Sequence, residues 1–171
     1  MYIRKSTMED VPRIMEIIVR ARKFMAETGN PTQWYNDRPR QEEIEKDIAN
    51  GTGYVCVHED RIIGTFHYNY GDKIEPFYNN LIEGEWIDDS PYAVIHRIAS
   101  DGTVKGTGAF CLNWALERCG HIRIDTHPNN KPMQGLLNKL EYTKCCVIPV
   151  KFDGSVRWGY EKSALTDKLR G

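Results

Sequence analysis

The segment Lys105-Gly106-Thr107-Gly108-Ala109-Phe110 has the residue types and the spacing to hold a phosphate group. It follows a strongly β-prone stretch, residues 92–99, and leads into a stretch with helical periodicity, residues 109–119. Alternating glycines at the start of a helix let backbone N–H groups converge on one point, and the helix dipole adds positive potential there. Lys105 can supply a cation at the mouth of such a site. The segment therefore predicts an anion site at a strand-to-helix turn.

The same glycines are also compatible with a purely steric role, because a tight turn needs backbone freedom. A dinucleotide fingerprint would need a third glycine at position 111, which is Cys111. The P-loop pattern needs Gly-Lys followed by Ser or Thr, whereas Lys105 precedes its glycine. Both of these nucleotide-binding patterns match weakly, and on this segment alone the phosphate and steric interpretations stay open.

The composition of the whole chain is that of an ordinary globular protein, with 40% hydrophobic and 27% charged residues among 171. The formal net charge of −1 disfavours a nucleic-acid partner, since duplex binders usually carry a basic excess. No apolar stretch approaches the roughly 20 residues that cross a bilayer. Residues 1–5 are not followed by the apolar core of a signal peptide. We therefore expect a cytoplasmic protein that binds neither nucleic acid nor a membrane.

The cysteines give no sign of a disulfide framework or a metal site. Their number is odd, and they form no CxxC pair. We expect reduced and mostly buried thiols and no bound metal; a nucleophilic thiol is the alternative. The five cysteines are Cys56, Cys111, Cys119, Cys145 and Cys146.

Hydrophobic periodicity and turn residues predict an alternation of helices and strands. Helices are expected over residues 8–25, 41–49, 109–119 and 132–140. Strands are expected over 2–4, 53–58, 61–68, 92–99, 121–126, 143–150 and 156–161. The βαβ unit in the second half predicts parallel pairing inside a largely antiparallel sheet.

We therefore expect an α/β (α+β) fold in a single domain over residues 1–162, followed by a polar C-terminal tail over 163–171. The domain would hold a mixed twisted β-sheet of about 6–7 strands flanked by about 4 helices. Residues 73–90 are expected to be irregular.

The order of these elements, with two of the motifs, resembles the GNAT superfamily of N-acetyltransferases. The glycine loop of that family is written R/Q-x-x-G-x-G/A; here Lys105 takes the first position, Gly108 matches the first glycine, and Phe110 stands where glycine or alanine is usual. Residues 130–142 are similar to the family's N-x-x-A-x-x-x-Y-x-x-x-G-F stretch. The resemblance covers nearly the whole chain, from residue 2 to 161.

The resemblance implies a GNAT-like fold with acetyl-CoA as co-substrate and an amine as acceptor. The backbone of residues 98–100 would pair with the pantetheine arm as an extra strand, and the N–H groups of residues 105–110 would hold the pyrophosphate. Asn130 and Met133 would flank the thioester. The implied cofactor-binding residues are Ile98, Ala99, Ser100, Lys105, Gly106, Thr107, Gly108, Ala109, Phe110, Asn130 and Met133.

The sequence departs from the family pattern at three places. Phe110 must point away from the cofactor or crowd it. Leu137 replaces the tyrosine that often protonates the departing thiolate, so that role would pass to water or to another residue, for which we name Tyr142. Glu141-Tyr142 replaces the usual Gly-Phe pair, so the closing turn can differ.

Acetyl transfer also needs a group that accepts the proton of the ammonium. His96 is the first choice, because it lies in the strand that would bind pantetheine, on the same side as Ile98 by period-two counting. The alternative is a half-buried strand histidine with a structural hydrogen bond. His58 and His67 are expected to be structural or surface groups. Other candidates for the base are Glu85, Asp125 and His127.

The function expected from these features is acetyl-CoA-dependent N-acetylation of a primary amine, on a small molecule or a peptide, by direct transfer in a ternary complex. Leu137 and Phe110 favour the alternative of a non-catalytic CoA- or acyl-CoA-binding regulatory module. A third hypothesis is a structural protein whose glycine loop holds no phosphate. An exposed strand near the C-terminus would allow a homodimer.

Overall fold

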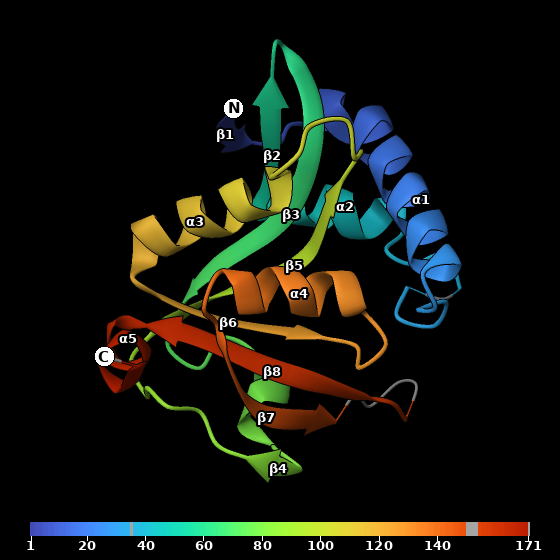
Figure 1. Ribbon diagram of the computed structural model, residues 1–171. Coiled ribbons are helices and arrows are strands. Elements are labelled where there is room, and N and C mark those ends of the chain that lie inside the picture. The colour runs from blue at the N-terminus through green and yellow to red at the C-terminus, as the bar shows by residue number, and fades with distance from the viewer. Residues whose placement is uncertain (35, 150–153, 171) are drawn as a thin grey trace. The chain divides into compact units, whose positions relative to one another are not determined.

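The computed structural model describes residues 1–34, 36–149 and 154–170 (Figure 1). Val150, the predicted end of a strand, and Gly171, the predicted end of the tail, lie outside the described residues. The chain forms two compact units. The first unit comprises Met1–Tyr68 and His96–Trp114, and the second comprises Asn69–Ile95 and Ala115–Gly171.

In the first unit the strands follow the order β1-β2-β3-β5. β1 and β2 pair antiparallel from Tyr2↔Val57 to Lys5↔Tyr54, and β2 and β3 pair antiparallel from Gly53↔His67 to His58↔Arg61. Three elements, β3, β5 and α3, begin in one unit and end in the other. The elements are β1 (Tyr2–Lys5), η1 (Met8–Asp10), α1 (Val11–Glu27), α2 (Gln41–Ala49), β2 (Gly53–His58), β3 (Arg61–Gly71), β5 (Tyr92–Ser100) and α3 (Thr107–Cys119).

The start of the first helical segment is set by a local hydrogen-bond exchange. The carboxylate of Asp10 accepts the backbone N–H of Thr7 at 2.8 Å and the guanidinium of Arg4 at 2.7 Å. The N–H of Asp10 in turn donates to the carbonyl of Thr7. This capping box satisfies donors that the first turn leaves unpaired, as the Thr7/Asp10 spacing indicates.

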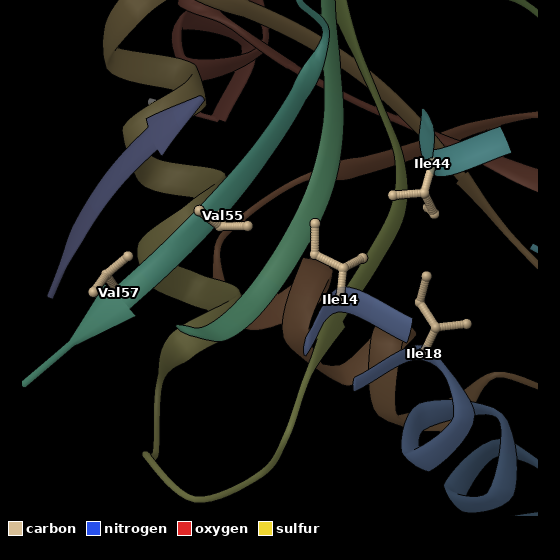
Figure 2. Packing of buried hydrophobic residues seen from close by; sticks show 5 residues of the cluster. All are labelled: Ile14, Ile18, Ile44, Val55 and Val57. Carbon is tan, nitrogen blue, oxygen red and sulfur yellow. The ribbon is translucent and has the colours of Figure 1, made fainter. Parts of the chain in front are cut away.

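Helices α1 and α2 cover one face of the strands with a cluster of branched aliphatic side chains. Ile14 and Ile18 of α1 pack with Ile44 of α2 and with Val55 and Val57 of β2 (Figure 2). Both α1 isoleucines are fully buried. Their spacing of four residues places them on one face of the helix. The core of the first unit therefore lies between these helices and the sheet.

The other face of the same strands packs against the start of α3. Tyr54, the neighbour of Val55 and so directed to the opposite face, lies 5.1 Å from the ring of Trp114 between centroids. Gly64 of β3 permits the close approach of this helix. A methyl group at Gly64 would lie 2.9 Å from Cγ2 of Thr107 and 3.2 Å from the carbonyl oxygen of Ala99.

In the second unit the strands follow the order β5-β6-β8-β7-β4. β5 and β6 pair in parallel at Ala93↔Ile122 and Val94↔Arg123, while β6–β8, β7–β8 and β4–β7 pair antiparallel. The elements added here are η2 (Pro76–Asn79), β4 (Glu83–Gly84), β6 (His121–Thr126), α4 (Lys131–Lys139), β7 (Thr143–Pro149), β8 (Val156–Ser163) and α5 (Ala164–Arg170).

A buried carboxylate organises the second unit. Glu161, which is 0% exposed, accepts Nε2 of His121 at 2.7 Å and Nε of Arg123 at 3.2 Å. It also accepts the backbone N–H of Ile87 at 2.5 Å. The guanidinium of Arg123 contacts the rings of Trp86 and Tyr92. Because a buried charge must be paired, this network ties the segment before β5 to β6 and β8.

The predicted mixed α/β fold with one parallel pair is confirmed, with differences in the number of elements. The described residues form eight strands and five α-helices, against the expected 6–7 and 4. The additions are β4, inside the stretch expected to be irregular, and α5, inside the expected polar tail. Helix α5 forms because the hydroxyl of Ser163 accepts the N–H groups of Leu165 and Thr166. Among the described helices none is long and apolar enough to cross a membrane.

The aliphatic cluster gives a stability prediction. Ile18→Ala should lower the free energy of unfolding by about 2–5 kcal/mol, because it leaves a cavity in a fully buried site. Urea unfolding would measure this change. The matched control is Val19→Ala, since the neighbouring Val19 is 56% exposed and should change the free energy by less than about 1 kcal/mol. Equal losses for the two variants would contradict the assigned packing.

Candidate functional site

The glycine segment turns sharply between the end of β5 and the start of α3. Gly106 has φ = +84°, a left-handed conformation that strains residues with a Cβ atom. A methyl group at Gly106 would meet no atom within 4 Å, so the requirement for glycine is conformational. The buried Thr107 follows, and its hydroxyl donates to the carbonyl of Val104 at 2.9 Å. These contacts fix the point where α3 begins.

The turn leaves backbone donors before the helix without a partner. Within the described residues, no hydrogen-bond acceptor is found for the N–H groups of Lys105 and Gly106, which lie in the hydrogen-bonded turn that leads into α3. The N–H of Phe110 donates to the carbonyl of Gly106 at 2.9 Å, so this amide belongs to the first helical turn. Unpaired N–H groups at the positive end of a 13-residue helix form a site suited to an anion. The anion site that the sequence predicts would lie at this helix start, and its role toward a cofactor stays a prediction.

Asp101 anchors the N-terminal side of this segment. Its buried carboxylate accepts the backbone N–H of Thr103 at 2.9 Å and Nη2 of Arg13 at 2.6 Å. Its own N–H donates to the carbonyl of Ile63, and Nε of Arg13 donates to that of Ile62. Burial alone would raise the pKa of Asp101, but the hydrogen bonds from Thr103 and the charge of Arg13 hold it below its usual value. The segment is thereby fixed to α1 and β3.

The backbone of β5 departs from regular strand geometry immediately before the residues predicted to bind pantetheine. Arg97 has φ = +53°, which is unusual for a residue with a side chain. Nη2 of Arg97 lies 3.3 Å from Nδ1 of His67, and the ring of the preceding His96 lies 5.8 Å from the His67 ring. Two consecutive residues thus approach the same side chain. Period-two counting from Ile98 therefore does not apply to His96.

Side chains of α2, β3 and β5 meet at this position in what we call the Asp47 cluster: Asp47, His67, His96 and Arg97. Asp47 accepts Nε of Arg97 at 3.0 Å and Nη2 at 2.6 Å. Nδ1 of His67 lies 3.0 Å from the same carboxylate. Burial favours a higher pKa for Asp47, but the hydrogen bonds from His67 and Arg97 together hold it below its usual value.

The sequence analysis did not assign a site role to Asp47, His67 or Arg97. One signal was available, because Asp47 follows Ile44 by three residues and precedes Ile48 on a helix whose apolar residues face the core. An acidic residue on the buried face of a helix needs a partner. Its partners are distant in sequence, and nothing in the local pattern identifies them.

The remaining predicted residues lie in the second unit. Asn130 is 6% exposed, and its side chain caps α4 by accepting the N–H of Met133 at 3.2 Å. Tyr142 is 2% exposed, burial raises the pKa of its hydroxyl, and no hydrogen-bond partner of that hydroxyl is found among the described residues. The roles of these three residues toward a cofactor stay predictions.

Of the three other candidates for the base, two take part in hydrogen bonds within the protein and the third is exposed. Asp125 accepts the hydroxyl of the buried Tyr78 at 2.5 Å, and Nδ1 of His127 accepts the N–H of Asn129 at 3.0 Å. Glu85 is exposed. The five cysteines are free thiols, with Cys56, Cys111 and Cys146 buried. No group of three or more His, Cys, Asp or Glu side chains suited to a metal ion occurs in the part of the chain that the structure describes.

The Asp101 anchor predicts a defined dependence of stability on pH. Because the pKa of Asp101 is lower in the folded protein than its ordinary 3.8, its contribution is present above that value and disappears as pH falls through the folded pKa. Asp101→Asn should lower the free energy of unfolding by about 1–3 kcal/mol at neutral pH. The difference between wild type and variant should be constant from about pH 5 to 8 and shrink below about pH 4. Urea unfolding at several pH values measures it, and a difference that persists unchanged at pH 3 would contradict the assignment.

Comparisons with known proteins place this geometry in a family. No family model and no curated protein matches the chain. Among solved structures, a GNAT-family acetyltransferase from Streptococcus agalactiae is 32% identical with a TM-score of 0.84, covering 95% of this chain and 94% of that chain. A ribosomal-protein-alanine N-acetyltransferase from Brucella melitensis is 16% identical with a TM-score of 0.60, over 95% and 99% of the two chains. An agmatine N-acetyltransferase is 14% identical with a TM-score of 0.59, over 94% and 97%.

The last two likenesses concern the fold alone. The first joins sequence identity to nearly complete coverage of both chains. With the mixed sheet described above, it establishes the relationship. The chain belongs to the GNAT family of acetyltransferases.

Proposed function

We propose that this protein transfers the acetyl group of acetyl-CoA to a primary amine, by direct transfer within a ternary complex. The observation that carries the proposal is the start of α3, where the left-handed Gly106 turns the chain and the N–H groups of Lys105 and Gly106 have no acceptor among the described residues. A diphosphate offers several anionic oxygens to such donors. In this proposal Lys105 adds a positive charge at the exposed edge of the segment.

Residues 98–100 of β5 would hold the pantetheine arm through their backbone. Ala99 is buried, whereas Ile98 and Ser100 are half-buried. Backbone recognition of this kind requires a strand that ends at the anion site, and β5 ends at Ser100, directly before Asp101. The order of strand and loop therefore suits a ligand with an extended arm and a diphosphate.

The acid–base step is assigned to His96. The acceptor amine must lose a proton before its lone pair attacks the acetyl carbon, and a histidine titrates in the required range. The N–H bond broken on the ammonium is replaced by an N–H bond on His96. The amine lone pair forms the carbon–nitrogen bond, and the carbon–sulfur bond then breaks. The nitrogen gives its second proton to water, and the thiolate takes a proton from water. A backbone N–H of β5 near Ile98 or Ala99 would stabilise the oxyanion.

The acceptor is left as a primary amine of a small molecule or a peptide. Structures with this fold include one named for agmatine and one named for a ribosomal-protein alanine. Both identities are below 20%, so neither acceptor transfers to this chain. A panel that contains polyamine-like and peptide amines covers both classes.

The test of the proposal is thiol release from acetyl-CoA in the presence of that panel. Release that depends on one of the amines, with the acetylated amine identified by mass spectrometry, would support an enzyme. Binding of CoA without amine-dependent release would instead favour the regulatory module, for which the buried Leu137 in place of a tyrosine is the supporting feature. Absence of any CoA binding would leave the glycine segment with a steric role.

The anion site is tested by Gly108→Val, which places a branched side chain beside the unpaired N–H groups. We expect the dissociation constant for CoA to rise at least about 100-fold, which corresponds to about 2.7 kcal/mol. Calorimetry measures it. The control is Gly135→Val, because Gly135 lies on the exposed side of α4 with nothing within 4 Å of an added Cβ. Near-normal affinity in Gly108→Val would remove the segment from the cofactor site.

The proposed base is tested by His96→Gln. Turnover should fall on the order of 100-fold at neutral pH, whereas the dissociation constant for CoA should stay within about twofold. The loss should diminish at a pH where the amine is already neutral. A pH–rate profile unchanged from the wild type would exclude His96 as the base.

A further inference from the structure

The Asp47 cluster has a feature that the proposed acid–base step does not use. His67 is the histidine that the carboxylate of Asp47 contacts, and its side chain is 14% exposed. The cluster combines a carboxylate, an arginine and two histidines on three elements of one unit, all within the distances given above. Its chemistry follows from where the protons must lie.

The proton positions on His67 follow from its partners. A carboxylate oxygen at 3.0 Å from Nδ1 can only accept, so Nδ1 must carry the hydrogen. Arg97, whose Nη2 lies 3.3 Å from the same nitrogen, is also a donor and cannot share that position as a hydrogen-bond partner of Nδ1–H. Arg97 therefore binds Asp47, and Asp47 fixes the Nδ1–H tautomer of His67. This leaves the lone pair of a neutral His67 on Nε2.

A second histidine of the protein provides an internal comparison. His121 in the second unit also shares a carboxylate, Glu161, with an arginine. Both of its ring nitrogens are engaged, because Nδ1 contacts Ser90 at 3.1 Å and the carbonyl of Pro91 at 3.2 Å. Because both of its ring nitrogens have partners, His121 has a structural role. For Nε2 of His67, by contrast, no hydrogen-bond partner is found within the residues described.

Among the described residues, the charged and titratable groups that face His67 come from α2 and β5. Asp47 approaches from α2, and His96 and Arg97 approach from β5. On β2 the residue opposite in register is Gly53, which has no side chain. A methyl group at that glycine would lie 2.5 Å from Oγ of Ser6, so the glycine makes room for the hydroxyl of Ser6, and 3.5 Å from the Cβ atom of Asp47, which is an ordinary contact. The guanidinium of Arg97 balances the charge of Asp47 at this position.

We infer that His67, oriented by Asp47, forms a proton relay with His96 in the acetyl transfer, which makes it a further acid–base residue of the site. This inference rests on the proposed function. The 5.8 Å between the ring centroids allows nitrogens of the two rings to be bridged by one water. The proton lost by the ammonium forms an N–H bond on His96, then passes to Nε2 of His67 while Nδ1–H continues to donate to Asp47. The imidazolium releases the proton to solvent, and both histidines return to the neutral state.

The test compares His67→Gln with the wild type across pH 6 to 9.5. The glutamine amide can still donate to Asp47, so the contact is kept while the titrating nitrogen is removed. We expect kcat with the accepted amine to fall at least about tenfold at pH 7 and the loss to shrink as pH rises, with the dissociation constant for CoA unchanged within about twofold. Asp47→Asn, acting through His67, should likewise lower kcat at pH 7, with a loss that shrinks as pH rises. The control is His58→Gln, on the β2–β3 hairpin, which should leave the profile unchanged.

Two results would overturn the inference. One is a His67→Gln enzyme with wild-type kcat at every pH; the other is a loss of equal size at every pH, which would indicate a structural role. Circular dichroism and CoA binding of each variant show whether it is folded. If the wild type itself released no thiol with any amine, the proposed function would fail instead, so the two failures are distinguishable.

Discussion

The carboxylate of Asp101 is the constraint on which the candidate site depends. Asp101 directly follows β5, and its backbone N–H donates to the carbonyl of Ile63 in β3. Its carboxylate oxygens accept hydrogen bonds from Thr103 in the loop and from Arg13. An acidic side chain that is 3% exposed is tolerated because these donors replace the water it has lost. The start of the segment is fixed there, and the start of α3 is fixed against Gly64. This anchoring sets the position of the intervening N–H groups, which the proposed function assigns to an anion.

The two units manage buried charge in the same way and obtain different results. Each contains a carboxylate shared between an arginine and a histidine. The partners of Glu161 include the N–H of Ile87, and its partners His121 and Arg123 also contact the carbonyls of Pro91 and Asp88. This network therefore defines the path of the segment before β5. Around Asp47 the histidine keeps one nitrogen uncommitted. The same composition can thus fix a fold or hold a reactive group, depending on whether the last hydrogen-bond position is filled.

Much of the fold could be predicted from the sequence, because its signals are local. The bounds of α2, β2 and β6 agree with the prediction, since each segment carries its own periodicity and its own turn residues. Helix α5 was not predicted, because its cap comes from Ser163 and its apolar residues are few. The glycine segment was proposed from spacing alone, and its role stays a prediction. The Asp47 cluster could not be, because residues 47, 67 and 97 meet only through the sheet, and the left-handed Arg97 breaks the alternation on which strand predictions depend.

Gly106 has a wider consequence for how this protein can change over evolutionary time. Glycine is required at this position for its left-handed backbone conformation. The proposed hydrogen-bond donors around it belong to the main chain, so the neighbouring side chains would contribute little to recognition of the anion. Substitutions at most positions of the loop can therefore accumulate while the backbone of residues 105–110 keeps its conformation. A family built on such a site can drift far in amino-acid identity and still be recognised by the path of its backbone.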